Sequence, residues 1–560
     1  MTLHGLEKKI QMCREYLAKT DFVRRMWEKD PTLWSKESTQ TQKIRDRLGW
    51  LNAPDWLERH RKEVESFAEE VRNRGMTHVA LLGMGGSSLA PQMLAATFPA
   101  KNQFPRLTVF DSTNPGELLQ KKAQLDLSKT LFLVSSKSGT TIEVSSLYRY
   151  FRAELNDGAR FAAITDEKTP LERLATENNF LRVFRNPSDI GGRYSALSYF
   201  GAVPAALIGI DIDRLIESAK KMAEACRRSP EENPGIRLGA FLGETQKSGA
   251  DKLALCFSPE ISSFGSWVEQ LVAESTGKLE KGILPVDGET RMPAAKYARD
   301  RLFVVTEYAR SADRTLGTWA DTLEKAGHPV LRLQLEDLHD LGGEFFRWEV
   351  ATAVAAVTLG IDPFDEPDVQ MSKRLTGKVL AEYASSGRIE EGARLAVSDG
   401  IYVYGDPDLM PKKSMASLSS SLDTHLSRIK EGDYLAWILY LPNYGWISAA
   451  FQRIREFIGS RFRVASTVGF GPRYLHSTGQ FHKGGPNRGL FIQVTAEPSE
   501  DVPIPGEAYS FGILHEAQAS GDFSALVGRG RRVLRLHVTG DLKTGLNRIE
   551  SILRKLEFGR

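Results

Sequence analysis

The chain has 560 residues, too many for a single hydrophobic core, and its length predicts roughly three or four domains. Hydrophobic residues make up 41% of the chain and charged residues 26%, which is typical of a soluble globular protein. The formal net charge is only +3 and no dense basic run is present, so we expect no nucleic-acid partner.

The three cysteines lack the spacing of a metal site, which indicates a reducing compartment and no bound zinc or other metal. The first residues carry charges where a signal peptide would need an apolar core. The longest apolar segment, Val350 to Ile361, is too short to cross a bilayer. We therefore predict a cytoplasmic protein without a membrane partner.

Two turns that follow predicted strands stand out early in the chain. An apolar strand from Thr77 to Leu82 runs into the glycine-rich turn Gly83 to Ser88, and a later strand runs into the hydroxyl-rich turn Ser135 to Thr141. A helix is expected to begin at about Thr140, with Glu143 completing a capping box. Its free N–H groups and the nearby hydroxyls suit a phosphate. A purely structural turn explains the hydroxyl-rich stretch equally well.

The position of these turns favours the phosphate interpretation. The alternation of strands and helices predicts a parallel sheet, and ligands of such sheets bind at the carboxyl ends of the strands. Another turn of this kind follows the predicted strand Leu181 to Phe184, where Gly191 and Gly192 precede Arg193. The paired glycines let the backbone approach a ligand while the guanidinium points at it. Without them, an arginine paired with a surface carboxylate would be the default interpretation.

A later part of the chain repeats an earlier one in outline. Glu274 to Gly282 and His476 to Gly484 share Ser, Thr, Gly, Lys and Gly at equivalent places, and Val330 to Leu333 recurs as Val533 to Leu536. We interpret this as an internal duplication with glutamate in one copy and histidine in the other. Chance similarity of short turns remains the alternative.

These patterns predict a division of the chain into five parts. The predicted parts are an N-terminal helical segment (1–75), a first α/β domain that binds phosphate (76–228), a second α/β domain (229–375), a helical and polar connection (376–432) and a third α/β region resembling a duplicate of the second (433–560).

Taken together, the motifs resemble the glucose-6-phosphate isomerase family, which is built from sugar-isomerase (SIS) domains. The resemblance implies α/β domains with SIS-type parallel sheets flanked by helices. Within the family, the motifs are similar to the isomerase portion of bifunctional transaldolase/isomerase proteins. Only some 75 residues precede the first strand, and we expect no transaldolase portion among them. The matching residues are Gly83 to Ser88, Ser136 to Thr141 with Glu143, Gly191 to Ser195, Gln270 with Glu274 to Lys278, Pro363 to Lys373, and His476 to Gln480.

The resemblance also implies roles for individual residues. Glu274 would be the base that moves a proton between carbons 2 and 1, Arg193 would stabilise the enediolate, and Gln270 would face the substrate. His476 and Lys373 would assist ring opening. The sugar phosphate would be held by Gly86, Ser87, Ser136, Lys137, Ser138 and Thr141.

The chemistry of an aldose–ketose interconversion needs groups of these kinds. One carboxylate can remove a carbon-bound proton and return it to the neighbouring carbon, and it does so best when partial burial brings its pKa towards neutrality. A guanidinium beside the enediolate oxygen lowers the barrier more than it stabilises the substrate. Ring opening needs a proton for the ring oxygen, which suits histidine. No redox cofactor or metal is required.

The chain departs from the family pattern in two places. First, the order along the chain is Glu274, Lys373, His476, whereas most relatives have the histidine soon after the glutamate. Second, Glu366 stands where the family usually has glutamine. In ordinary relatives the histidine comes from the neighbouring subunit of a dimer. If His476 belongs to a second copy within the chain, one chain completes its own site, and we expect either a homodimer or a self-sufficient, pseudo-dimeric monomer.

The leading hypothesis is reversible isomerisation of glucose 6-phosphate and fructose 6-phosphate in glycolysis and gluconeogenesis. An isomerase for a mannose or amino-sugar phosphate is the first alternative, because a phosphate site does not distinguish the sugar hydroxyls. A non-catalytic SIS protein that senses sugar phosphates is the second. Such a sensor would not need Glu274, Arg193 and His476 together.

Overall fold

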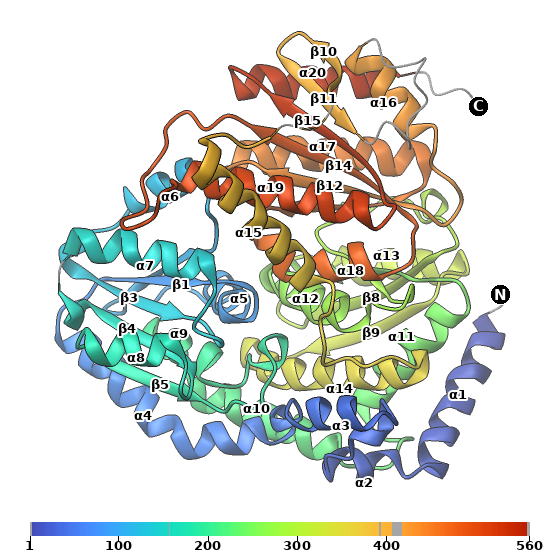
Figure 1. Ribbon diagram of the computed structural model, residues 1–560. Coiled ribbons are helices and arrows are strands. Elements are labelled where there is room, and N and C mark those ends of the chain that lie inside the picture. The colour runs from blue at the N-terminus through green and yellow to red at the C-terminus, as the bar shows by residue number, and fades with distance from the viewer. Residues whose placement is uncertain (1–2, 156, 391, 393, 406–416, 557–560) are drawn as a thin grey trace. The chain divides into compact units, whose positions relative to one another are not determined.

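The computed structural model describes residues 3–155, 157–390, 392, 394–405 and 417–556 (Figure 1). Its residues pack into two units. Unit 1 comprises Met1–Asp111, Lys121–Gly288 and Arg301–Glu366, and unit 2 comprises Ser112–Gln120, Glu289–Asp300 and Pro367–Arg560.

Unit 1 begins with a run of helices, of which α4 packs against its first sheet. The longest of them, α4, has an apolar face that buries Leu57, Val64, Phe67 and Val71. Phe67 meets Phe184 of the sheet edge to face, with ring centroids 5.1 Å apart. These helices are α1 (Leu3–Lys19), α2 (Phe22–Trp27), α3 (Ser38–Arg45) and α4 (Ala53–Asn73).

The first sheet of unit 1 is parallel throughout, with the strand order β2-β1-β3-β4-β5. Helices lie on both of its faces (Figure 1), so β1 and β3 are almost completely buried, as expected for a parallel sheet. Its strands are β1 (His78–Gly83), β2 (Arg106–Phe110), β3 (Thr130–Ser135), β4 (Phe161–Asp166) and β5 (Arg182–Asn186). The helices along this stretch are α5 (Leu89–Thr97), α6 (Pro115–Lys122), α7 (Ile142–Leu155), α8 (Pro170–Glu177) and α9 (Tyr199–Leu207).

The pairing of β1 with β3 places the two predicted ligand turns at one edge. Gly83 pairs with Ser135, the last residue of each strand, so the glycine-rich and the hydroxyl-rich turn leave the sheet side by side. The order of the strands changes direction between β1 and β3, and such switch points are where α/β sheets bind ligands. The helix after the second turn, α7, begins at Ile142 and not at Thr140, so it starts slightly later than expected.

The second sheet of unit 1 is also parallel, with the order β7-β6-β8-β9. The helix α14 is apolar on nearly all sides and buried along most of its length, as is typical of a helix inside a core. The strands are β6 (Lys252–Phe257), β7 (Leu284–Val286), β8 (Arg301–Tyr308) and β9 (Val330–Leu335). The helices are α10 (Ile212–Ala225), α11 (Pro234–Lys247), α12 (Phe264–Thr276), α13 (Thr315–Lys325) and α14 (Leu341–Leu359).

Unit 2 contains a third, mixed sheet with the order β10-β11-β15-β14-β12-β13. Its strands are β10 (Arg394–Ser398), β11 (Ile401–Gly405), β12 (Tyr434–Tyr440), β13 (Ala465–Phe470), β14 (Gly489–Ala496) and β15 (Arg532–Val538). Strands β12 to β15 are parallel, whereas β11 is antiparallel to both β15 and β10. The helices are α15 (Val369–Ser386), α16 (Leu418–Leu426), α17 (Gly445–Phe462), α18 (Gly479–Gly484), α19 (Phe511–Gly528) and α20 (Leu542–Lys555).

The stretch 376–432 is more than the helical and polar connection that its composition suggested. It supplies β10 and β11, which extend the third sheet on the outer side of β15. Polar residues obscured the strands because an antiparallel edge strand such as β10 buries only part of its side chains. Residues 391, 393 and 406–416 of this stretch lie outside the described residues.

The structure confirms a third α/β region and one of the two correspondences inferred for the duplication. Val330 to Leu333 lies in β9 and Val533 to Leu536 lies in β15, and each is the fourth parallel strand of its sheet along the chain. When the parallel strands of a sheet are counted along the chain, those of the second sheet lie side by side in the order second, first, third, fourth. The parallel strands of the third sheet have the same order, and the first sheet has this order followed by a fifth strand. Glu274 lies in α12, which precedes β7, the second strand of its sheet. His476 follows β13, the second strand of the third sheet. The two Ser-Thr-Gly segments therefore occupy different connections, and their pairing was wrong.

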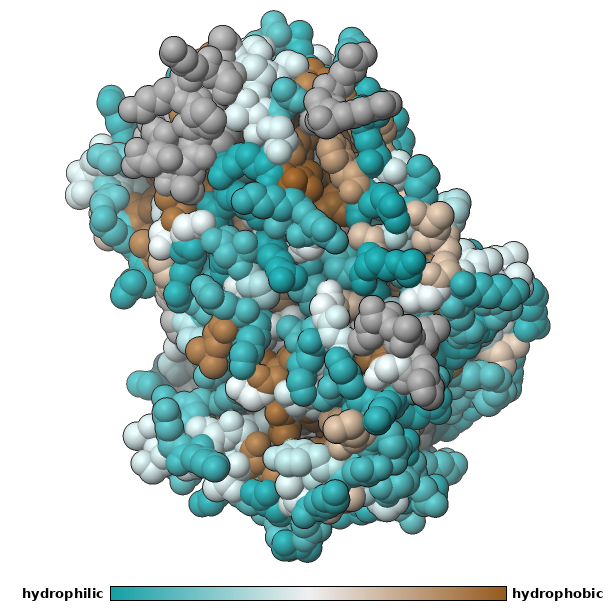
Figure 2. Space-filling model, turned by 90° about the vertical axis from the view of Figure 1, so that its right-hand side faces the viewer, coloured by the Kyte–Doolittle hydropathy of each residue, from teal (hydrophilic) through white to brown (hydrophobic). Residues whose placement is uncertain are grey.

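No helix in the described ranges is long and apolar enough to cross a membrane. On the face of the molecule shown in Figure 2, hydrophilic side chains predominate, and the apolar ones lie among them in small groups.

Candidate functional site

Arg193 is the centre of a buried polar network in unit 1. It lies in a short 3₁₀ helix, Gly192–Tyr194, and is only 4% exposed. Its Nε donates to Oγ of Ser275 at 2.8 Å, and Nη2 donates to the carbonyl oxygens of Pro363 and Asp365 at 2.7 and 3.0 Å. Nη1 donates to Oε2 of Glu366 at 2.9 Å. The side chain is thus held in one orientation by groups from two segments, α12 and the loop 363–366.

Glu274 lies beside this guanidinium, near the end of α12. Its Oε1 is 3.4 Å from Nη1 of Arg193, and its Oε2 accepts a hydrogen bond from Nε2 of Gln270 at 3.1 Å. Gln270 precedes Glu274 by one helical turn, which puts both side chains on one face of α12. The carboxylate is 9% exposed. The structure therefore brings together Glu274, Arg193 and Gln270, three residues singled out in the sequence.

The charges of this cluster balance one another. Burial by itself would lower the pKa of Arg193, but the negative charges of Glu274 and Glu366 outweigh it and raise that pKa. Burial would raise the pKa of Glu366, and Arg193 more than reverses this, so the pKa of Glu366 is lowered. The guanidinium therefore stays charged in the buried site.

The glycine-rich turn packs directly against the backbone next to Arg193. A Cβ on Gly86 would lie 1.9 Å from the carbonyl oxygen of Gly192, so only glycine fits this approach. Oγ of Ser195 also reaches the carbonyl oxygen of Gly86 at 3.5 Å. Ser87, predicted to bind phosphate with Gly86, is 9% exposed in the same turn. The glycine-rich turn of the predicted phosphate site thus packs against the backbone beside Arg193.

The hydroxyl-rich turn forms the other side of the predicted phosphate site. Oγ of Ser136 lies 3.0 Å from Oγ1 of Thr141, while Ser138 is exposed. Lys137 does not stand alone, because its ammonium is paired with Asp166 and donates to the carbonyl oxygen of Ser188. Burial lowers the pKa of Lys137, and the negative charge of Asp166 opposes that effect.

His476 and Lys373, the predicted ring-opening residues, both belong to unit 2. Lys373 is exposed on α15, and His476 is partly exposed at the end of a 3₁₀ helix, Arg473–His476. The start of α15 is joined to α18, which follows the 3₁₀ helix of His476. Gln480 of α18 donates to the carboxylate of Asp368 at 2.8 Å and accepts from the backbone N–H of Asp368 at 2.9 Å.

Three residues that hold the cluster were not assigned a role from the sequence. They are Ser275, Lys278 and Asp365. Nζ of Lys278 donates to the carbonyl oxygen and to Oδ1 of Asp365, both at 2.6 Å. Lys278 is 3% exposed, and burial lowers its pKa while Asp365 opposes the shift. The sequence signals for them were that Ser275 and Lys278 stand in the same motif as Glu274, and that Asp365 lies in the motif Pro363 to Lys373.

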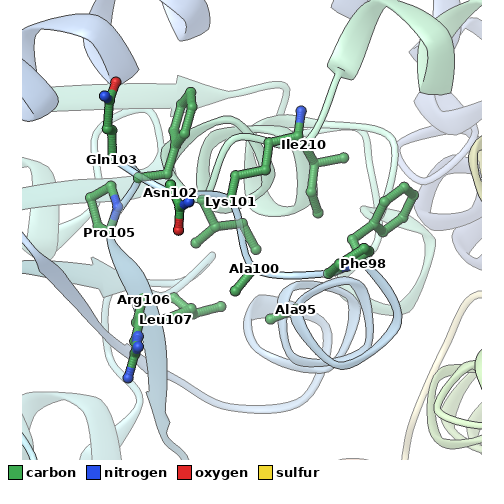
Figure 3. A pocket seen from close by; sticks show the side chains of 13 residues that line it. Ala95, Phe98, Ala100, Lys101, Asn102, Gln103, Pro105, Arg106, Leu107 and Ile210 are labelled. Atoms are coloured by element: carbon green, nitrogen blue, oxygen red, sulfur yellow. The ribbon is translucent and has the colours of Figure 1, made fainter.

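Unit 1 also contains a cavity of about 310 Å³, which is a poor candidate for the active site. It lies around Phe98, Phe104 and Ile210 and reaches Arg106 at the amino end of β2 (Figure 3). Its cations, Lys101 and Arg106, are exposed. Ligands of parallel sheets bind at the opposite edge of the strands, where the two turns lie.

Comparison with known proteins identifies relatives of this chain. The family model described as phosphoglucose isomerase matches residues 57–311. A glucose-6-phosphate isomerase of Rubrobacter xylanophilus is 27% identical over 399 residues, which cover 62% of this chain and 90% of the relative. A glucose-6-phosphate isomerase of Staphylococcus aureus is 30% identical over 318 residues, which cover 53% of this chain and 68% of the relative.

Two solved structures share the fold. A hypothetical protein from Thermus thermophilus has a TM-score of 0.58 at 24% identity, covering 68% of this chain and 98% of that one. A glucose-6-phosphate isomerase from Chlamydia trachomatis has a TM-score of 0.55 at 18% identity, covering 67% and 86%. The similarity to bifunctional transaldolase/isomerase proteins stays a prediction. The sequence relatives and the parallel-sheet fold lead to one conclusion: the chain belongs to the glucose-6-phosphate isomerase family.

Proposed function

We propose that this protein catalyses the reversible isomerisation of glucose 6-phosphate and fructose 6-phosphate. The observation that carries the proposal is the buried contact between Glu274 and Arg193, beside the backbone on which the glycine-rich turn packs. Its homologues named glucose-6-phosphate isomerase support the choice of substrate. The reaction belongs to glycolysis and gluconeogenesis, and we expect it to take place in the cytoplasm.

In the proposed mechanism Glu274 is the base. It takes the proton from carbon 2 of the open-chain aldose and returns it to carbon 1, so no net proton is consumed. Arg193 is already fixed by Ser275 and by backbone carbonyls, and therefore needs no reorganisation when the enediolate develops negative charge beside it. Gln270 orients the carboxylate through the hydrogen bond to Oε2.

The remaining predicted residues bind the substrate or open its ring. The turns that contain Gly86 and Ser87, and Ser136, Lys137, Ser138 and Thr141, would hold the phosphate. Lys137 would do so while bound to Asp166, or after exchanging that partner for the phosphate. His476 and Lys373 are proposed to assist ring opening, His476 by giving a proton to the ring oxygen.

A coupled assay of fructose 6-phosphate conversion tests the proposal, with Glu274→Gln as the decisive variant. Removing a general base costs roughly 10²- to 10⁴-fold in rate, so we expect kcat to fall by at least a hundredfold. Glu280→Gln is the matched control, because Glu280 is an exposed glutamate six residues further along. Unchanged turnover in Glu274→Gln would remove this residue from the mechanism.

The same assay separates the alternatives. A higher kcat/KM with mannose 6-phosphate or an amino-sugar phosphate would favour an isomerase of different specificity. Binding of fructose 6-phosphate without turnover of any of these sugars would favour a sensor.

A further inference from the structure

Unit 2 contains a cavity that the proposed isomerase chemistry does not use. It measures about 230 Å³ and is lined by residues at the carboxyl ends of β12, β14 and β15, together with the first turns of α19. Tyr440 ends β12 and Ala496 ends β14, and these two neighbouring strands flank the point where the strand order changes direction. Parallel sheets bind their ligands at this kind of switch point. The cavity therefore lies where the fold places a ligand site.

Arg535 supplies the positive charge of the cavity. Its Nε donates to Oε1 of Gln493 at 2.6 Å, its Nη2 donates to the carbonyl oxygen of Ala519 at 3.0 Å, and its guanidinium lies over the ring of Phe523 at 4.4 Å. The side chain is thus fixed by neutral groups. Within the described ranges, no carboxylate lies within ion-pair distance of it, and Nη1 has no hydrogen-bond acceptor.

Two carboxylates, Asp522 and Glu516, act on Arg535 from beyond ion-pair distance. Asp522, whose charge acts on Arg535, is itself paired with Nζ of Lys483 at 2.8 Å and accepts a hydrogen bond from Tyr474. Burial lowers the pKa of Arg535 to about 10, partly offset by nearby tyrosines and carboxylates, so the side chain stays charged near neutral pH. A fixed cation that no carboxylate contacts directly can pair with an anionic group of a ligand.

The rest of the cavity offers hydroxyl and imidazole groups. Oγ1 of Thr495 is 2.9 Å from Nδ1 of His537, and Nδ1 of His515 is 3.1 Å from Oγ1 of Thr113. Burial lowers the pKa of His515 to about 4, so its imidazole is neutral and adds no charge. Such groups can bind the hydroxyls of a ligand.

The charges around the cavity limit the ligand to low negative charge. Glu497, Asp501 and Glu516 also line it, and Asp501 is occupied by the backbone N–H groups of Val502 and Gly512. One guanidinium among these carboxylates suits a singly charged carboxylate better than a phosphate dianion. The volume is below the roughly 300–1,000 Å³ of sites for drug-sized ligands and fits a small metabolite.

We propose that this cavity is a second ligand site, which binds a small hydroxylated carboxylic acid through Arg535. Isothermal titration of the full chain with D-gluconate tests the proposal, and we expect saturable binding that persists in the presence of saturating fructose 6-phosphate. Arg535→Gln should weaken this binding at least tenfold. Arg548→Gln is the matched control, because Arg548 is a surface arginine of the same unit, and it should bind like the unaltered chain.

A second variant keeps the test decisive if Arg535→Gln does not fold. Ala496→Leu retains the guanidinium and fills part of the cavity, so it should also weaken gluconate binding at least tenfold. Three results would overturn the proposal: no gluconate binding, binding that neither variant weakens, or binding that fructose 6-phosphate displaces. If inorganic phosphate binds and gluconate does not, with the binding lost in Arg535→Gln, the ligand class is wrong.

Discussion

The guanidinium of Arg193 lies 3.4 Å from the carboxylate of Glu274, and both side chains are almost completely buried. A base and an electrophilic partner this close can act on neighbouring atoms of one substrate, because the proton leaves a carbon next to the oxygen that gains charge. Glu366 takes the shorter contact with Arg193, at 2.9 Å, and leaves the longer one to Glu274. The looser contact suits a carboxylate that must exchange a proton.

We expect Arg193→Lys to lower kcat by roughly 10²- to 10³-fold, as losses of a single oxyanion-stabilising donor do. A lysine cannot reproduce the planar donor arrangement that reaches Ser275, two carbonyls and Glu366. Steady-state kinetics with fructose 6-phosphate measure the loss. Arg185→Lys, at an exposed arginine of β5, is the control and should stay within twofold of the unaltered protein. A kcat equally unaffected in both variants would contradict the role given to Arg193.

Gly86→Ala should disrupt the contact between the glycine-rich turn and Arg193. The added Cβ would lie 1.9 Å from the carbonyl oxygen of Gly192, so the two backbones must separate. Overpacking of this kind costs about 1–3 kcal/mol in the free energy of unfolding, and we expect a higher KM for fructose 6-phosphate as well. Denaturant unfolding gives the first quantity. Gly192→Ala is the control for stability, since its Cβ would have no neighbour within 4 Å. Equal stability of the two variants would argue against this packing.

Glu366→Gln should keep most of the activity and change how stability depends on pH. The amide oxygen can still accept from Nη1 of Arg193, and glutamine is the residue that the family usually has here. Because the pKa of Glu366 is lowered in the folded state, its stabilisation is complete above its ordinary value of 4.5 and is lost as the pH falls through the folded value. Its side chain is 36% exposed, so the effect at neutral pH is on the order of 1 kcal/mol.

Urea unfolding of the unaltered protein and of Glu366→Gln, at neutral pH and at successively lower pH values, measures this difference. We expect the two free energies of unfolding to converge below pH 4.5. A constant difference over the whole range would show that the charge of Glu366 does not stabilise the fold.

Lys137→Gln should raise KM for fructose 6-phosphate about tenfold, with kcat changed only a few-fold, if the ammonium binds the substrate phosphate. One charged hydrogen bond is worth about 1.5–3 kcal/mol, and a group that binds substrate and transition state equally affects KM alone. Lys129→Gln, an exposed lysine of the same domain, is the control. If the pair with Asp166 is purely structural, the variant will lose stability without a change in KM.

Mixing two inactive variants tests whether one chain completes its own site. Glu274→Gln and His476→Gln are co-expressed and assayed together. If His476 acts within its own chain, the mixture stays inactive. In a dimer that exchanges His476 between subunits, heterodimers would contain one intact site, and about a quarter of the activity would return. Recovery of that size would contradict a self-sufficient chain.

Local sequence signals predicted the elements around the site with good accuracy. Apolar runs located β1 and β3, because parallel strands in the middle of a sheet are buried on both faces and show little polar interruption. Glycines and hydroxyl residues directly after β1 and β3 located the turns at the switch point. Less regular stretches were misinterpreted: β10 and β11 were hidden in a polar segment, and a shared Ser-Thr-Gly pattern paired two segments from different connections.

The sequence by itself determined the local elements and singled out the residues proposed to carry the chemistry, since a candidate base, a guanidinium and candidate phosphate-binding turns are recognisable from residue type and neighbours. Only the tertiary structure decided their partners. Arg193 contacts Glu366 and the carbonyl of Pro363, about 170 residues further along the chain. Lys137, just after β3, pairs with Asp166 at the end of the neighbouring strand β4. Such pairs depend on how the chain crosses over between sheets, and no local periodicity records that path.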